Sequence, residues 1–148
     1  KIVLGIADFP ALNERYVGYD KISYKLMNNK KRILKVKSNS LSKSILSSTS
    51  TYAFKNINDK NIFEKILKKV KTVHMGGDCY QYCLLADGYI DIILESGLNC
   101  YDIRALIPIV RNSGGSIKTW NGQSPNDGGK IIATSSRKLL SAVQALIT

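Results

Sequence analysis

The pattern of apolar residues changes partway along this 148-residue chain, and the change restricts the folds that it can adopt. Residues 1–37 contain short apolar stretches separated by turn signals such as Asn28–Asn29, a pattern typical of an antiparallel meander. From residue 44 onwards, β-branched stretches alternate with segments whose apolar residues recur every three or four positions. This alternation predicts an α/β fold: an antiparallel sheet remnant followed by a mixed, largely parallel sheet with helices.

The second part of the chain supplies most of the expected elements. We expect strands at 44–51, 73–77, 89–96, 116–120 and 130–135, and helices at 58–73, 78–88, 101–115 and 136–147. Asn58 or Asp59 is expected to cap the first helix, and Asp78 the second. We therefore divide the chain into antiparallel strands at 1–38 and a C-terminal α/β domain at 39–148.

The strongly basic charge raises the question of nucleic-acid binding, because basic patches bind phosphate backbones. The formal net charge is +11, but residues 1–72 hold 16 Lys and Arg against 5 acids, whereas residues 73–148 hold 6 against 6. The lysines are scattered between Ile, Asn and Ser rather than interleaved with aromatic residues that could stack on bases. A solvated lysine-rich surface explains this distribution better, and nucleic-acid binding is kept as a secondary alternative.

Three cysteines, Cys79, Cys83 and Cys100, indicate the compartment of the protein. Their odd number and their spacing do not suit a disulfide framework or a zinc knuckle. Cys79 and Cys83 could share a helix face near His74 and bind a metal, but free thiols in a reducing cytosol explain them better. No apolar run reaches the ~20 residues of a membrane span. We therefore expect a cytoplasmic protein without a membrane segment.

The stretch ESGLNCYDIRALIPIVRNSGG, residues 95–115, carries the most informative carboxylates. Glu95 stands at the end of an apolar run, and Asp102 opens a segment with helical periodicity that is otherwise almost wholly apolar. Spacing alone favours a plain helix cap for Asp102, because Asp is among the best N-cap residues. A metal ligand is the alternative, and the surrounding residues decide between the two.

Those surrounding residues resemble a known family. The segment GGDCYQYCLLADGYIDIILESGLNCYDIRALIPIVRNSGGSIKTWNG is similar to the C-terminal half of the inositol monophosphatase family, and GIADFP and ERYVG extend the similarity to the N-terminal part. The hallmark is an aromatic residue followed by Asp, then a run that ends in Gly-Gly, here Tyr101–Asp102 and Gly114–Gly115. Tyr rather than Trp before the aspartate resembles bacterial histidinol-phosphate phosphatases within this family.

The resemblance implies a Mg²⁺-dependent phosphatase of layered helices and sheets that acts on a phosphate monoester. It implies that Asp102 is a metal ligand, since Mg²⁺ prefers carboxylate oxygens. Glu95 matches a position that contacts the organic part of the substrate, and a carboxylate suits hydroxyls or the protonated amine of histidinol. Gly76 and Asp78 fall where the family brings a strand end and a helix start against the substrate, although Asp78 could also serve only as a cap.

The family's other metal ligands, its catalytic acid and its phosphate-cradling loop lie in upstream motifs, a Glu-Glu segment and an Asp-Pro-Ile-Asp-Gly-Thr segment, that do not occur in these residues. We therefore assign no catalytic residue to this chain and expect it to be inactive alone, as the C-terminal portion of an enzyme for histidinol phosphate. An activity on inositol monophosphate and a degenerate remnant that serves as a binding module remain alternatives. His74 stands where relatives usually have Arg, and a structural, hydrogen-bonded role is the simpler interpretation.

The antiparallel strands also predict association. Ile2, Leu4 and Ile6 would form one face of the first strand, with Tyr16 and Val17 following, and such exposed faces and edges recruit other chains. We expect a homo-oligomer, specifically a dimer, or association with a missing N-terminal half.

Overall fold

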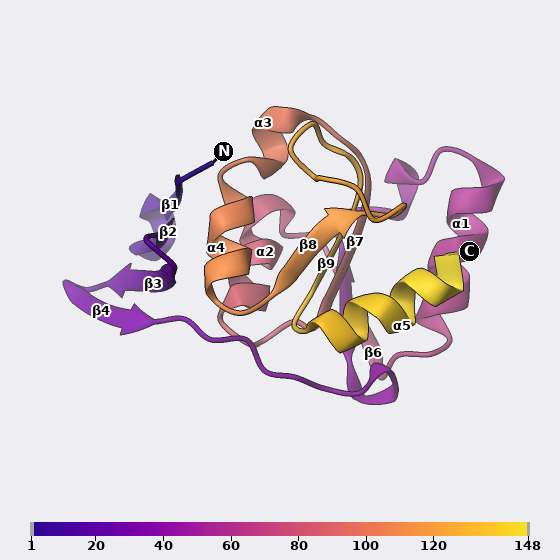
Figure 1. Ribbon diagram of the computed structural model, residues 1–148, viewed down its shortest axis with the longest axis horizontal. Coiled ribbons are helices and arrows are strands. Elements are labelled where there is room, and N and C mark those ends of the chain that lie inside the picture. The colour runs from indigo at the N-terminus through magenta and orange to yellow at the C-terminus, as the bar shows by residue number, and fades with distance from the viewer. Residues whose placement is uncertain (1, 148) are drawn as a thin grey trace.

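The computed structural model describes residues 2–147, and it contains two β-sheets with helices packed between and beside them (Figure 1). The first sheet, called sheet A, is antiparallel with the order β1-β2-β3-β4. Its strands are β1 (Leu4–Phe9), β2 (Glu14–Tyr19), β3 (Ile22–Met27) and β4 (Lys30–Ile33). Asn28 and Asn29 both have positive φ and form the tight turn before β4, which confirms the expected meander.

The second sheet, called sheet B, has five strands in the order β6-β5-β7-β9-β8. Its strands are β5 (Ile45–Ser48), β6 (Thr72–Met75), β7 (Ile92–Leu98), β8 (Ser116–Thr119) and β9 (Gly129–Thr134). Strand β5 runs parallel to β6 and β7, whereas β9 runs antiparallel to β7 and β8. The α/β fold with an antiparallel sheet followed by a mixed sheet is thus confirmed.

The helices complete a layered arrangement. They are α1 (Ile57–Leu67), α2 (Asp78–Ala86), α3 (Cys100–Ile103), α4 (Leu106–Asn112) and α5 (Arg137–Ile147), with single 3₁₀ turns η1 (Pro10–Leu12), η2 (Leu41–Lys43) and η3 (Thr51–Ala53). Helices α2 and α4 lie between the two sheets, and α1 and α5 cover the other face of sheet B (Figure 1). No helix within residues 2–147 is long and apolar enough to cross a membrane.

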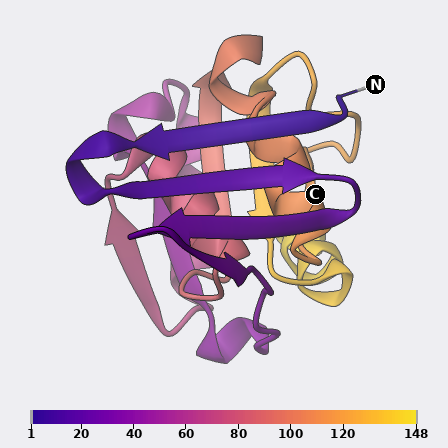
Figure 2. The same cartoon turned by 90° about the vertical axis from the view of Figure 1, so that its left-hand side faces the viewer.

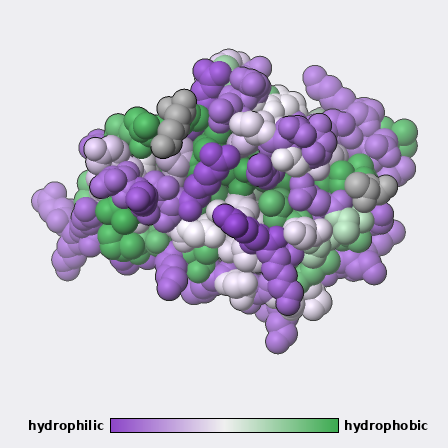
Figure 3. Space-filling model, in the orientation of Figure 1, coloured by the Kyte–Doolittle hydropathy of each residue, from purple (hydrophilic) through white to green (hydrophobic). Residues whose placement is uncertain are grey.

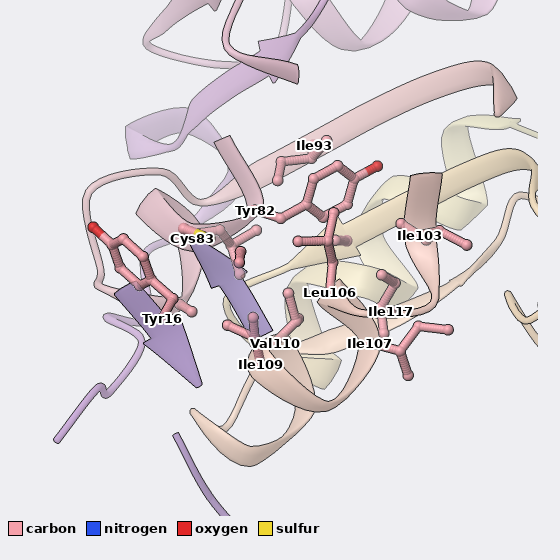
Figure 4. Close-up of a cluster of buried hydrophobic side chains, with 14 of the residues drawn as sticks. Tyr16, Tyr82, Cys83, Ile93, Ile103, Leu106, Ile107, Ile109, Val110 and Ile117 are labelled. Carbon is pink, nitrogen blue, oxygen red and sulfur yellow. The ribbon is translucent and has the colours of Figure 1, made fainter. Parts of the chain in front are cut away.

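Two apolar clusters form the core, one on each face of sheet B. The cluster between the sheets combines Tyr16 from sheet A with Tyr82 and Cys83 from α2 and with side chains of α4 (Figure 4). The other cluster packs sheet B against α1 and α5 and includes Leu46, Phe54, Phe63, Trp120 and Val143. Sheet B is therefore buried on both faces.

Sheet A approaches α4 very closely, and glycine makes this approach possible. A Cβ atom on Gly18 would lie 2.4 Å from the backbone nitrogen of Ile109, and one on Gly5 would lie 1.9 Å from the carbonyl oxygen of Ala105. In the same contact, the Ser23 hydroxyl donates a hydrogen bond of 2.7 Å to the carbonyl oxygen of Ile109. Backbone therefore packs on backbone here.

The helix expected at 101–115 is two helices, and this expectation was wrong about its continuity. Helix α3 ends at Ile103 and α4 begins at Leu106. Pro108 explains the break, because a proline cannot donate to the carbonyl four residues earlier, here that of Arg104, and its ring clashes with that carbonyl.

The expected helix caps also need correction. The N-cap of α1 is Asn56, not Asn58 or Asp59, and its side chain accepts a hydrogen bond from the Asp59 N–H. The N-cap of α2 is Gly77, and Asp78 is the first helical residue. In both helices the cap lies one to three residues before the predicted position.

Sheet A turns one face toward α2 and α4 and the other away from them (Figure 2). This outer face carries exposed apolar side chains. Its exposed large apolar residues are Leu4, Ile6, Tyr19, Ile22 and Ile33, which the strand register brings together. Val17 lies in the same rows but is almost fully covered by its neighbours. Tyr16 was expected here and instead points between the sheets, where it is fully buried. Elsewhere, hydrophilic side chains dominate the surface in view in Figure 3.

Candidate functional site

A pocket of about 480 Å³ lies where β5 and β7 end and where α2 and α3 begin. Its lining residues are Thr49, Ser50, Ala53, Asp78, Cys79, Tyr82, Glu95, Ser96, Leu98, Tyr101 and Asp102. It unites three of the four predicted site residues, and we call it the carboxylate pocket. Gly76 does not line it: this residue stands just after β6 with a φ of +90°.

Glu95 is the most buried of the three carboxylates, with 3% of its surface exposed. Its Oε1 atom accepts hydrogen bonds of 2.6 Å from the Thr49 N–H and 2.6 Å from Nε2 of Gln81. Burial raises the pKa of Glu95, and these donors oppose that rise. Both of these hydrogen bonds go to Oε1, which leaves Oε2 as the oxygen available to a ligand in the pocket.

A polar network extends from Glu95 into the layer between sheet B and α2. Nε2 of Gln81 also donates to Oγ1 of Thr49 at 3.0 Å, and the Ser47 hydroxyl donates to Oε1 of Gln81 at 2.7 Å. Nδ1 of His74 lies 3.3 Å from the same Ser47 oxygen. His74 is thus an exposed residue of the edge strand β6 that is hydrogen-bonded to Ser47, and it is not one of the lining residues of the pocket.

Asp102 lines the pocket from α3. It is exposed, and its Oδ2 atom accepts a 2.7 Å hydrogen bond from the Asn99 N–H. Asn99 is the N-cap of α3, so Asp102 is not the N-cap but closes a capping box from the third helical position. Its Oδ1 atom has no hydrogen bond within the described chain and can meet a ligand.

Asp78 lines the pocket from the first position of α2. Its φ is +41°, a left-handed conformation that is uncommon for a non-glycine residue. Gly77 before it also has a positive φ, so the chain turns sharply as it leaves β6 and enters α2. This turn brings the Asp78 carboxylate to the pocket.

The residues of the pocket fit Mg²⁺ only in part. Carboxylate oxygens are suitable ligands. Across residues 2–147, however, no group of three or more His, Cys, Asp or Glu side chains is arranged to hold a metal ion. At the alternative site of Cys79, Cys83 and His74, both cysteines are free, with Cys79 exposed and Cys83 buried. Asp102 can contribute an oxygen to a metal site, but the described residues do not complete one.

Sequence reasoning missed Thr49, Gln81 and Tyr82. Thr49 could have been found, because it follows β5, and the carboxyl ends of neighbouring parallel strands meet at one edge of a sheet. The Tyr82 hydroxyl is buried without a hydrogen-bond partner in residues 2–147. Burial, together with the charges of Glu95 and Asp102, raises its pKa far above the usual value, so this phenol stays protonated.

The model of the inositol monophosphatase family matches residues 1–147. The chain is 38% identical over 123 residues to the bifunctional phosphatase IMPL2, chloroplastic, of Arabidopsis thaliana, covering 83% of this chain and 35% of that protein. It is 38% identical over 58 residues to a histidinol-phosphatase of Mycobacterium tuberculosis, covering 39% of this chain and 22% of that protein.

A solved structure agrees. An inositol monophosphatase from Zymomonas mobilis has a TM-score of 0.89 and 33% identity, and the match covers 98% of this chain and 57% of that chain. The chain thus spans roughly a third of the Arabidopsis protein and somewhat more than half of the Zymomonas protein. On the match to the family model over nearly its whole length, this chain belongs to the inositol monophosphatase family.

Proposed function

We propose that this chain forms the C-terminal portion of a Mg²⁺-dependent phosphomonoesterase and that the carboxylate pocket receives part of the substrate. The charge of the pocket carries the proposal: Asp78, Glu95 and Asp102 line it, and its described lining residues include no Lys or Arg. Carboxylates repel a phosphate ester, so a divalent cation has to stand between the two. Membership of the family supports Mg²⁺ as this cation.

Asp102 is the residue we assign to the metal, through its free oxygen. A Mg²⁺ ion held by Asp102 and further ligands would neutralise phosphate charge and would supply an activated water. The capping hydrogen bond from Asn99 holds the other oxygen of Asp102 and so orients the carboxylate. Because Mg²⁺ needs several oxygen ligands, the remaining ligands come from outside the described residues, and the described chain alone is inactive.

The substrate we favour is histidinol phosphate. Its protonated amine matches the available Oε2 atom of Glu95, since a charge-assisted hydrogen bond to a carboxylate is strong. Asp78 adds a second negative charge beside it. Gly76 lies outside the described lining of the pocket, in open space, and its contact with the substrate stays a prediction. The Mycobacterium relative named a histidinol-phosphatase supports this choice.

Inositol monophosphate is the second candidate, because the hydroxyls of an inositol ring can also donate to Glu95. A structure of a staphylococcal relative is described as bound to inositol monophosphate. The third candidate is a remnant that binds without catalysis.

The test is phosphate release by a longer protein that contains this chain, or by this chain joined to the N-terminal part of the Zymomonas relative. With Mg²⁺ we expect release from histidinol phosphate in preference to inositol monophosphate, and no release after chelation. Asp102→Asn should abolish release while it preserves folding, because the amide oxygen still accepts from Asn99.

Asp127→Asn is the matched control, since Asp127 is an exposed aspartate outside the pocket, and it should leave release unchanged. Release from neither ester would leave only the remnant. Loss of activity in Asp102→Asn through unfolding, detected by circular dichroism, would reduce Asp102 to a helix-capping residue.

A further inference from the structure

Glu95 is a buried carboxylate, and the side chains that line the pocket with it carry no positive charge. The titratable side chains that line the pocket with it are Asp78, Cys79 and Tyr82 on α2 and Tyr101 and Asp102 on α3. None of these is cationic, so none favours the ionised form of a buried carboxylate. Within the described chain, the donors that do so are the N–H and the hydroxyl of Thr49 and the side-chain amide of Gln81.

We infer that Gln81 is the positioning residue that keeps Glu95 oriented and ionised for an amine-bearing ligand. In the same arrangement, Ser47 and His74 orient the amide of Gln81. The inference deepens the proposed function, on which its choice of ligand rests.

The direction of each hydrogen bond follows from the charge of Glu95. An ionised carboxylate only accepts, so the NH₂ group of Gln81 faces Glu95 and Thr49. The carbonyl oxygen of Gln81 then faces Ser47, whose single proton is used in donating to it. The Ser47 oxygen is left as an acceptor for Nδ1 of His74.

Neutral His74 is therefore the tautomer with its proton on Nδ1, because a neutral imidazole has one donor and one acceptor nitrogen. The imidazolium form also carries a proton on Nδ1. The network thus keeps its direction whether or not His74 is charged, and it depends on Glu95 rather than on His74.

The network also decides which oxygen of Glu95 meets the ligand. Thr49 and Gln81 both donate to Oε1, so Oε2 is the atom presented to the pocket. Gln81 is fully buried between sheet B and α2 and has little freedom to move. Glu95 itself stands where the pairing of β7 with β9 shifts register, an irregularity that re-aims side chains at the end of a strand.

The first test uses the chain itself, because His74 is its single histidine. Nitrogen-15 correlation spectra at a pH where His74 is neutral should show the proton on Nδ1. Gln81→Met should remove this preference, because the Ser47 hydroxyl is then free to donate to His74. Ser47→Ala should also remove it, because the hydroxyl itself is lost. Gln123→Met makes the same change at an exposed loop position and should leave the tautomer unchanged. A proton on Nε2 in the unmodified chain, or no response to either variant, would overturn the inference.

The second test follows the Glu95 side-chain carboxyl by carbon-13 NMR as pH is varied. Gln81→Met should raise the pKa of Glu95 by about one unit, because one hydrogen bond to a charged group is lost. His74→Asn retains a side-chain donor near the position of Nδ1 and should leave the titration close to that of the unmodified chain. An unchanged pKa in Gln81→Met would contradict the role of Gln81.

Neither test measures phosphatase activity, so both can be interpreted even if the proposed function is wrong. In an active longer protein, Gln81→Met should raise KM for histidinol phosphate several-fold near neutral pH with little change in kcat. KM for inositol monophosphate should change less, since an uncharged ring needs no ionised partner. Equal changes in KM for both esters would show that Gln81 does not contribute to recognition of the amine.

Discussion

The two sheets of this protein differ in how many of their faces are covered by other elements. Sheet B has apolar clusters on both faces, one against α2 and α4 and one against α1 and α5. Sheet A packs on α4 and α2 with one face and exposes an apolar row on the other. Because an apolar sheet face gains stability only when it is covered, sheet B carries its own stabilising layers and sheet A depends on its single contact with the helices.

The largest expected effect tests this single contact. Gly18→Ala places a methyl group against the backbone of α4, and we expect a loss of about 3 kcal/mol in the free energy of unfolding. Equilibrium unfolding in urea measures the loss. Hydrogen exchange should accelerate in β2 and β3 more than in β7 and β9, because sheet B keeps both of its clusters.

Gly129→Ala is the matched control for the change of glycine to alanine. Its φ is +89° and no atom lies within 4 Å of the added methyl group, so only backbone strain of about 1 kcal/mol is expected. If Gly18→Ala costs no more than Gly129→Ala, the sheet does not dock on α4 as described.

The sheets also differ in the direction in which each shifts the pKa of a glutamate that is shielded from solvent. Glu14 of sheet A is partly buried, which opposes its ionisation, but Lys25, Tyr80 and Tyr16 together donate enough hydrogen bonds to hold its pKa below the ordinary value of 4.5. Burial instead raises the pKa of Glu95 in sheet B above 4.5. The first carboxylate is stabilised as an anion by the fold, whereas the second is held as an anion at a cost in stability, as residues at binding sites often are.

The second prediction uses the opposite signs of these shifts. Glu14 contributes stability that is complete above pH 4.5 and is lost as pH falls through its lower folded pKa. Glu14→Gln should therefore destabilise the protein by about 2 kcal/mol at pH 7 and remove this acid-dependent loss.

Ionisation of Glu95 lowers stability as pH rises from 4.5 through its higher folded pKa, so Glu95→Gln should leave stability at pH 7 equal or higher. Urea unfolding at pH 4 and pH 7 measures both variants. A larger loss at pH 7 in Glu95→Gln than in Glu14→Gln would reverse the comparison.

Local sequence signals predicted most of the fold because each one acts through neighbouring residues. The Asn28–Asn29 turn, the alternation after residue 44 and the glycine after α2 were all found in this way. The break at Ala105 was missed because apolar periodicity continues through Pro108 although the helix does not. The division of the chain at residues 38 and 39 stays a prediction.

The pocket was predicted less completely, since its residues come from four separate elements. Family resemblance singled out Asp78, Glu95 and Asp102, and the fold places them around one pocket. Their assigned roles stay predictions. Gln81 carries no local signal of its position, because its contacts to Ser47 and Glu95 exist only once α2 packs on sheet B.

The smallest expected effect concerns the outer face of sheet A and leaves the stability of the single chain largely unchanged. We expect two copies to associate through this face, because Leu4, Ile6 and Ile22 are exposed apolar residues on it and β1 and β4 are the edge strands of sheet A. Ile6→Lys and Ile22→Lys should each weaken self-association by about tenfold, the equivalent of one buried aliphatic side chain. Sedimentation at tens of micromolar measures the constant.

Tyr52→Lys is the control for this comparison, since Tyr52 is 92% exposed and lies on η3, next to sheet B rather than sheet A. It removes more exposed apolar surface than either isoleucine variant and should nevertheless leave association unchanged. If the unmodified chain sediments as a compact monomer, self-association is wrong. If Tyr52→Lys weakens association as much as Ile6→Lys, the copies meet through the sheet B region. The exposed apolar residues of sheet A are then covered by a segment other than a second copy of this chain.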